Sequence, residues 1–189
     1  MTLTTHGNLK LCIGLDITLE SIPHHIRQSP HPVQEFARRI IAATYEYADS
    51  YKINFAYFEQ LGVDGLNVLS DVAALVPESK HLIADAKRGD IAVSSEAYCK
   101  AIYSLGRFNA ATVNPYMGSD SIKPFLMKNN TTTFILALTS NHGSNDFQRL
   151  LYNNKPLYIN VIEKCSSWTD YPSQVGFVVG ATHPNELAE

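Results

Sequence analysis

Residues 81–90 read HLIADAKRGD, and the rest of the chain is expected to be arranged around this stretch. Its apolar start predicts a buried parallel strand, which places Asp85 and Lys87 at the C-terminal end of that strand. Side chains two residues apart on a strand share a face, so an acid and an ammonium group are expected to point the same way. The next two residues turn the chain, and Asp90 leaves the line of the strand. Two carboxylates therefore bracket one lysine.

This cluster of charges has two interpretations. Burying an ionisable group costs several kcal/mol unless the group finds partners, so a fold selected only for stability rarely buries three of them. That cost favours a functional site. The alternative is a solvated strand end that carries an ordinary Asp-Lys salt bridge and a turn, and the spacing alone leaves both open.

A lysine near carboxylates in an enclosed site can be a Schiff-base nucleophile, a phosphate ligand or a proton donor. Flanking acids raise the pKa of an amine because they stabilise its charged form, whereas a Schiff-base lysine needs a lowered pKa. The acids around Lys87 therefore favour the role of proton donor, and the positive charge would also stabilise a developing carbanion.

Strands and helices are predicted to alternate along the chain. The pattern predicts further strands at 10–16, 51–55, 109–114, 132–138 and 175–180. It predicts helices at 32–48, from Asp64 to 76, from Ser94 or Ser95 to 105, from 119, at 146–152, at 156–168 and from 184 to 189. Six βα units around a parallel sheet follow, which permits either a flat doubly wound sheet or an incomplete (β/α)8 barrel. A complete barrel commonly takes about 250 residues.

Polar candidates gather where the predicted strands end. They are Asp16, Lys52, Asp85, Lys87 and Ser140. In barrels this C-terminal edge is where active sites are built.

Length and composition fit a single domain over residues 1–189 with a substantial core. The net charge of -3 and the charged fraction of 17% predict neither a nucleic-acid nor a membrane partner. The cysteines, at positions 12, 99 and 165, lack the spacing of a zinc site and are expected to be reduced and mostly packed. With no signal or transmembrane pattern, a cytoplasmic protein is predicted.

Several motifs resemble one known family. They are LCIGLD (11–16), YKINFAYFEQLG (51–62), DAKRGDI (85–91), VNPYMGSDSIKPF (113–125), LALTSN (136–141) and GFVVGATHP (176–184). In this order, over nearly the whole chain, they resemble the longer-looped branch of the orotidine 5′-monophosphate decarboxylase family. The resemblance selects the α/β (β/α)8 TIM barrel, of which about six βα units are present.

The resemblance implies loss of CO2 from pyrimidine C6 of orotidine 5′-monophosphate, giving uridine 5′-monophosphate in pyrimidine biosynthesis without cofactor or metal. Lys87 would protonate the C6 carbanion, and Asp85 would lie beside the departing carboxylate. Lys52 would orient Asp85 and contact the ribose. Asp16 would accept from a ribose hydroxyl, and Ser140 would bind the pyrimidine edge.

The resemblance also implies a homodimer in which Asp90 acts across the interface, with Ile91 and the hydroxyl of Ser94 beside it. The sequence departs from the family pattern directly after Ile91. The family usually continues with Gly-Asn-Thr or similar, whereas this chain has Ala92, Val93 and Ser94.

The chain is expected to end before the family's seventh and eighth strands, which carry a glycine-rich loop and an arginine that grip the phosphate. A protein of these 189 residues alone is therefore expected to have little activity. Two alternatives remain at this point. One is a metal-dependent sugar-phosphate decarboxylase or aldolase on a similar barrel, and the other is a non-catalytic remnant that binds or scaffolds.

Overall fold

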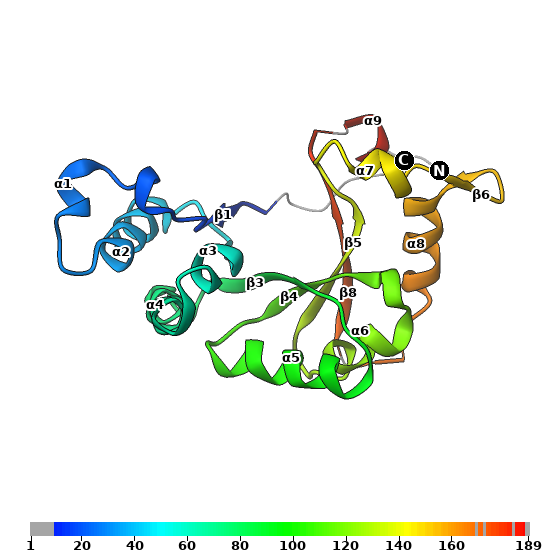
Figure 1. The fold of residues 1–189 in the computed structure, drawn as a ribbon, viewed down its shortest axis with the longest axis horizontal. Coiled ribbons are helices and arrows are strands. Elements are labelled where there is room, and N and C mark those ends of the chain that lie inside the picture. Colours follow the sequence, from blue (N-terminus) through cyan, green and yellow to red (C-terminus); the bar gives the residue numbers. More distant parts are fainter. Residues whose placement is uncertain (1–9, 169, 172, 183, 188–189) are drawn as a thin grey trace. The chain divides into compact units, whose positions relative to one another are not determined.

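The computed structural model describes residues 10–168, 170–171, 173–182 and 184–187. Within these residues, the main sheet has six strands, hydrogen bonded in the order β1-β2-β3-β4-β5-β8. They are β1 (Cys12–Gly14), β2 (Ser50–Asn54), β3 (His81–Arg88), β4 (Ala110–Val113), β5 (Thr132–Leu138) and β8 (Gln174–Val179). The predicted alternation of strands and helices is confirmed (Figure 1).

Helices follow the strands along the chain. The α-helices are α1 (His24–Arg27), α2 (Pro32–Thr44), α3 (Ala56–Glu59), α4 (Gly62–Leu75), α5 (Ala92–Ser104), α6 (Ser119–Leu126), α7 (Ser144–Phe147), α8 (Leu157–Ser166) and α9 (Pro184–Leu187). Two short 3-10 helices, η1 (Leu19–Ser21) and η2 (Pro115–Met117), and a hairpin of β6 (Leu151–Tyr152) and β7 (Lys155–Pro156) complete the described elements.

The described residues divide into two compact units. The N-terminal unit holds residues 10–86 and 98–111, and the C-terminal unit holds residues 87–97 and the described part of 112–187. The boundaries between the units fall after Ala86 in β3, after Ala97 in α5 and after Ala111 in β4.

Three parallel strands organise the N-terminal unit. Gly14 lies opposite Lys52, and Lys52 lies opposite Ile83. Because the strands are parallel, their carboxyl ends meet at one edge of the sheet. Polar residues after β1, in β2 and in the first part of β3 therefore lie close together at this edge.

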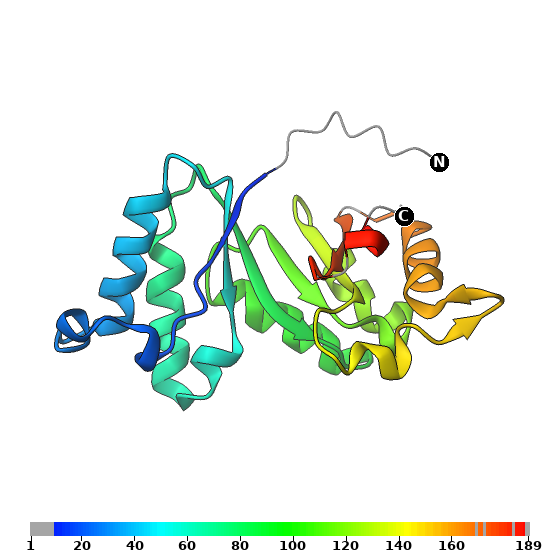
Figure 2. The same cartoon turned by 90° about the horizontal axis from the view of Figure 1, so that it is seen from above.

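Two long helices cover this unit and lie side by side (Figures 1 and 2). Helix α2 begins at Pro32, whose fixed φ suits the first helical position. Ala37 of α2 and Leu69 and Val72 of α4 have no exposed surface, so these helices bury a continuous apolar face. The helices cover the apolar part of this unit, and its inward-facing charged side chains lie at the polar edge of the strands.

The parallel pair β5 and β8 forms the centre of the C-terminal unit, with Thr133 opposite Val175. The hydroxyl of buried Thr133 lies 2.8 Å from that of Ser173, which satisfies both polar groups inside the core. The β6–β7 hairpin packs on α8 (Figure 1), and the Asn160 side-chain amide donates to backbone carbonyls of the hairpin region, including that of Tyr152.

The structure shortens or shifts several predicted elements. The first strand spans only Cys12–Gly14 and not 10–16, and strand 109–114 is reduced to β4. The helix predicted at 146–152 is wrong beyond Phe147, because Leu151 and Tyr152 form a hairpin strand. Asn153 and Asn154 have φ of 52° and 60°, the conformation of a two-residue hairpin turn, which asparagine tolerates well.

The predicted helix caps are also wrong. Helix α4 begins at Gly62, whose φ of 67° lets the chain turn before Asp64, so Asp64 lies in the first turn. Ser94 and Ser95 lie inside α5, where both of their N–H groups donate to the carbonyl of Ile91. The helix predicted from 184 is present as α9, and its last two predicted residues lie outside the described part of the chain.

The cysteines are all free and two of the three are packed, as predicted. Cys99 and Cys165 are buried, whereas Cys12 is exposed. Burial raises the pKa of the Cys165 thiol to about 11, so this thiol stays protonated at neutral pH.

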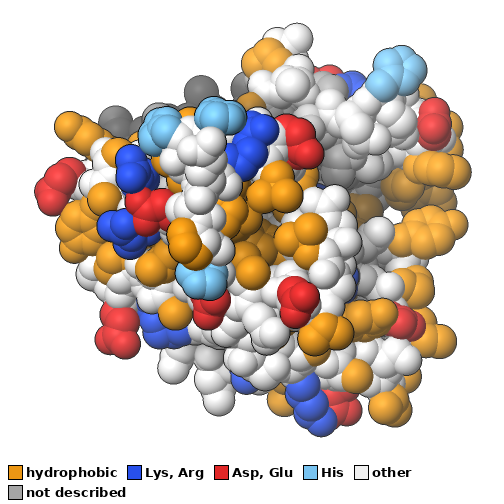
Figure 3. All heavy atoms as spheres, turned by 60° about the vertical axis from the view of Figure 1, so that its left-hand side comes forward, with side chains coloured by type: hydrophobic (Ala, Val, Ile, Leu, Met, Phe, Trp, Pro, Cys, Tyr) orange, Lys and Arg blue, Asp and Glu red, His pale blue; other side chains and the backbone are white. Residues whose placement is uncertain are grey.

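The surface drawn in Figure 3 carries Lys and Arg side chains interspersed with Asp and Glu among apolar groups. This mixture agrees with the small net charge of the sequence. Within the ranges that the structure describes, every helix is too short or too polar to cross a membrane.

Candidate active site

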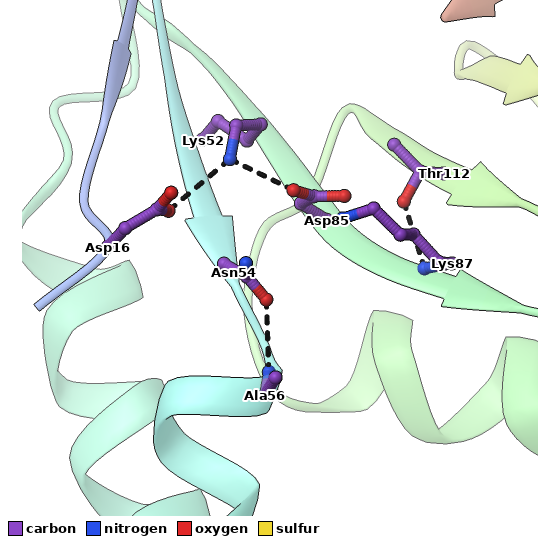
Figure 4. Close-up of polar contacts among 7 residues, drawn as sticks. All are labelled: Asp16, Lys52, Asn54, Ala56, Asp85, Lys87 and Thr112. Carbon is purple, nitrogen blue, oxygen red and sulfur yellow. Dashed lines mark hydrogen bonds and ion pairs between the residues drawn. The ribbon is translucent and has the colours of Figure 1, made fainter. Parts of the chain in front are cut away.

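Lys52 lies between two carboxylates at the polar edge of the N-terminal unit (Figure 4). Its Nζ donates to Asp85 Oδ2 at 2.9 Å and to Asp16 Oδ1 at 3.3 Å. Asp16 follows β1, Lys52 lies in the middle of β2 and Asp85 lies in β3, so three neighbouring strands each supply one member. The three residues form the Asp16–Lys52–Asp85 chain of charges.

Burial increases from Asp16 to Asp85 along this chain of charges. The side chain of Asp16 is 41% exposed, that of Lys52 is 29% exposed, and that of Asp85 is 9% exposed. A buried carboxylate is costly unless an opposite charge and hydrogen bonds compensate it, and Lys52 supplies both to Asp85. The arrangement therefore holds a negative charge in place where water has little access.

The two acids also set the protonation state of Lys52. Burial by itself lowers the pKa of this amine, because it disfavours the charged form. The hydrogen bond and charge of Asp85, helped by those of Asp16, outweigh burial, so the pKa of Lys52 stands above its ordinary value of 10.5. Lys52 is accordingly an ammonium group at neutral pH.

Lys87 adopts an unusual backbone conformation. Its φ is 47°, the left-handed region, which costs a non-glycine residue about 1–2 kcal/mol. Its N–H donates to the hydroxyl of Thr112 in β4 at 2.9 Å (Figure 4), and Lys87 as a whole is exposed. The prediction that Lys87 shares a face with Asp85 assumed extended geometry, and the left-handed backbone at Lys87 departs from it. Backbone strain of this kind is typical of functional sites.

Asp90, Ile91 and Ser94 lie just beyond β3, at the start of α5. The Asp90 carboxylate accepts a hydrogen bond of 2.7 Å from the N–H of Ile91, whose side chain is 56% exposed. Ser94 is also exposed, in the first turn of α5. Between them, Ala92 has a φ of 44°. Ala92, the first residue after the motif DAKRGDI, is therefore in a left-handed conformation although it carries a side chain.

Ser140 follows β5 and is exposed. A close approach on one side fixes its backbone, since a Cβ at Gly180 would lie only 2.9 Å from the N and Cα of Ser140. On the other side, the side-chain amide of Gln148 accepts from the N–H of Thr139 at 2.7 Å and donates to the Thr139 hydroxyl at 2.9 Å. The segment that carries Ser140 is thus held by residues from two other elements.

The structure brings Asp16, Lys52 and Asp85 into contact. The other predicted site residues, namely Lys87, Asp90, Ile91, Ser94 and Ser140, belong to the C-terminal unit.

Sequence reasoning missed Thr112, Gln148 and Gly180, which hold the backbone near predicted site residues. A buried threonine in the run AATV reads as an ordinary strand residue, so only the structure reveals that its hydroxyl bonds to Lys87. Gly180 could have been found from the sequence, because it comes directly after an apolar strand, where a glycine often marks a close approach of backbone.

This is an α/β protein whose parallel strands carry charged residues toward their carboxyl ends, as the strands of (β/α)8 barrels do. The model of the orotidine 5'-phosphate decarboxylase / HUMPS family matches residues 9–189. This chain belongs to that family.

Two curated relatives illustrate the match. An orotidine 5'-phosphate decarboxylase of Christiangramia forsetii is 45% identical over 182 residues, covering 95% of this chain and 66% of that protein. One of Thermomicrobium roseum is 41% identical over 180 residues, covering 94% of this chain and 64% of that protein. The chain thus spans about two thirds of the length of these relatives.

A solved structure shows the same fold. The structure of Leishmania donovani OMP decarboxylase matches with a TM-score of 0.82 and 39% sequence identity, and the match covers 93% of this chain and 67% of that chain. The family and the barrel fold implied by the sequence motifs are therefore confirmed.

Proposed function

We propose that this protein decarboxylates orotidine 5′-monophosphate to uridine 5′-monophosphate and CO2, a step of pyrimidine biosynthesis. Membership of the family supports the proposal, as do relatives about 40% identical that are named orotidine 5'-phosphate decarboxylase. The observation that carries it is the Asp16–Lys52–Asp85 chain of charges, because it offers a fixed buried carboxylate and an adjacent ammonium group at a strand edge.

Each charge in this chain has a proposed task. Lys52 holds Asp85 in one orientation, and Asp85 lies beside the carboxylate that leaves. Asp16, the most exposed member, accepts a hydrogen bond from a ribose hydroxyl, and Lys52 also contacts the ribose. Lys52 pairs with both carboxylates in the absence of substrate, and preorganised charges of this kind act most strongly where water is excluded.

Lys87 is the proposed proton donor. The bond between C6 and the carboxyl carbon breaks, its electron pair stays on C6, and CO2 departs. The Lys87 ammonium then gives its proton to C6, and the neutral amine regains a proton from solvent. An ammonium group both stabilises the developing carbanion by its charge and supplies the proton, so one residue serves two stages.

The remaining site residues complete the proposal. Ser140 binds the pyrimidine edge. The active protein is a homodimer in which Asp90 reaches the partner's site, with Ile91 and Ser94 beside it. The hydrogen bond between Asp90 and the N–H of Ile91 and the exposure of Ile91 and Ser94 are compatible with this arrangement. The described units belong to one catalytic barrel domain of a cytoplasmic enzyme, which needs no metal or cofactor.

The test offers orotidine 5′-monophosphate to the purified protein and follows CO2 release and the change in pyrimidine absorbance, with and without EDTA. Sugar phosphates that carry a carboxylate or a cleavable C–C bond serve as competing substrates. We expect release of CO2 from orotidine 5′-monophosphate above the uncatalysed background, unchanged by EDTA. Loss of turnover on chelation, or turnover of a sugar phosphate alone, would favour the metal-dependent enzyme on a similar barrel and contradict the proposal.

A further inference from the structure

A side-chain hydroxyl binds the backbone near the end of β3. The N–H of Lys87 donates to the Thr112 hydroxyl of the neighbouring strand β4 at 2.9 Å. Thr112 is 5% exposed, so its hydroxyl is held inside the protein at this point.

A backbone hydrogen bond follows directly after Lys87. The N–H of Asn114 donates to the carbonyl of Arg88 at 2.7 Å. Gly89 then passes close to Asn114, since a Cβ at Gly89 would lie 3.1 Å from the Asn114 Cβ. Backbone pairing thus fixes the residues after Lys87, and the Thr112 hydroxyl fixes the N–H of Lys87 itself.

The left-handed φ of Lys87 needs such a restraint. A φ of 47° is unfavourable for a residue with a Cβ, so the segment would relax toward extended geometry if nothing held it. The direction of a side chain follows from the φ and ψ of its own residue. A change in φ at Lys87 would therefore move its ammonium group even if the rest of β3 stayed in place.

We propose that Thr112 is a positioning residue, whose hydroxyl holds the Lys87 backbone in its left-handed conformation and so aims the ammonium group. The proposal rests on the proposed function, because it assigns Thr112 a part in the same proton transfer. Thr112 acts only through Lys87 and takes no chemical step of its own. Loss of the Thr112 hydroxyl should therefore lower the reaction rate and leave substrate affinity unchanged.

The test compares Thr112→Val with Thr112→Ser in the purified protein. Valine has nearly the same shape as threonine but no acceptor, whereas serine keeps the hydroxyl. Thr133→Val is the matched control, because Thr133 is a buried strand threonine whose hydroxyl lies against Ser173. Steady-state kinetics with orotidine 5′-monophosphate and amide hydrogen exchange at Lys87 are measured for all variants.

We expect Thr112→Val to lower kcat by about ten- to a hundredfold with little change in KM, since small misplacements of a reacting group cost this much. The Lys87 amide should exchange faster in this variant. Thr112→Ser should restore both properties, and Thr133→Val should change neither. Unchanged kcat in Thr112→Val, or equal losses in the valine and serine variants, would overturn the proposal.

The exchange measurement separates this proposal from the proposed function. If the wild-type protein releases no CO2 from orotidine 5′-monophosphate, the proposed function fails. Faster exchange of the Lys87 amide in Thr112→Val alone would still support the restraint on the backbone. Equal exchange in the wild-type protein and Thr112→Val would refute the restraint whether or not the protein is active.

Discussion

Lys52 Nζ lies 2.9 Å from Asp85 Oδ2, and this ion pair links the centre of β2 to a nearly buried carboxylate in β3. The two residues come from neighbouring parallel strands, with Lys52 opposite Ile83, two residues before Asp85. Removing one partner would leave the other charge poorly compensated, which is more destabilising than never having buried the pair. The contact therefore couples the electrostatics of the site to the stability of the sheet.

Asp85→Asn should lower the pKa of Lys52. Burial lowers this pKa and the Asp85 carboxylate is the main group that opposes it, so loss of the carboxylate lets burial dominate. Titration of the Lys52 side-chain nitrogen by NMR measures the change. Asp16→Asn is the matched control and should lower the pKa less, because Asp16 is farther away at 3.3 Å. Equal effects of the two substitutions would contradict this ranking.

The same raised pKa predicts how stability depends on pH. The folded protein holds the Lys52 proton to a higher pH than the unfolded chain, whose lysine has the ordinary value near 10.5. The contribution of the pair is therefore fully present below about pH 10 and is lost as pH rises through the folded pKa. Urea unfolding of wild type and Lys52→Met at pH 8 and above pH 10.5 should show the difference in stability shrinking at high pH. A difference that grows with pH would refute the assignment.

Ala92→Gly should stabilise the protein. At a φ of 44°, alanine carries strain of about 1–2 kcal/mol, whereas ordering a glycine costs about 0.5–1 kcal/mol. The net gain is expected to be up to about 1 kcal/mol in the free energy of unfolding, measured by urea denaturation. Ala97→Gly in the same helix is the control and should destabilise by about 1 kcal/mol. Destabilisation by both substitutions would show that the left-handed residue is not strained.

Two inactive variants should restore activity when mixed. If Asp90 acts in the partner's site, a dimer of one Lys87→Ala chain and one Asp90→Ala chain has one site with Lys87 and Asp90 both intact. Activity should return after subunit exchange, up to about a quarter of wild type if chains pair at random and exchange is complete. Mixed dimers detected by mass spectrometry without any recovered decarboxylation would show that the site is not shared.

Much of the fold could be predicted because apolar runs and helical stripes are local signals. Strand 132–138 was predicted with the bounds of β5, since its β-branched residues leave little choice. The hairpin turn at Asn153 and Asn154 was not predicted, because asparagine can adopt positive φ but is a weaker turn signal in a sequence than glycine. Helix starts were misplaced where Gly62 and Ala92 turn the chain through positive φ, which side-chain capping rules do not consider.

Part of the candidate site could likewise be predicted from the sequence, and part could not. Asp16, Lys52 and Asp85 could be predicted as neighbours because parallel strands align their carboxyl ends. The left-handed Lys87 and its bond to Thr112 could not be predicted, since both depend on a contact between β3 and a side chain of β4. Long-range contacts of this kind leave no periodic trace in the sequence.

The role of Lys87 is best measured by decarboxylation of orotidine 5′-monophosphate by Lys87→Ala at saturating substrate beside wild type. Lys100→Ala, which removes an exposed lysine of α5, is the control. We expect Lys87→Ala to lose about 10²–10⁴-fold in kcat, since a positioned proton donor contributes that much, while Lys100→Ala keeps wild-type turnover. Wild-type turnover by Lys87→Ala would contradict the assignment of Lys87 as the proton donor.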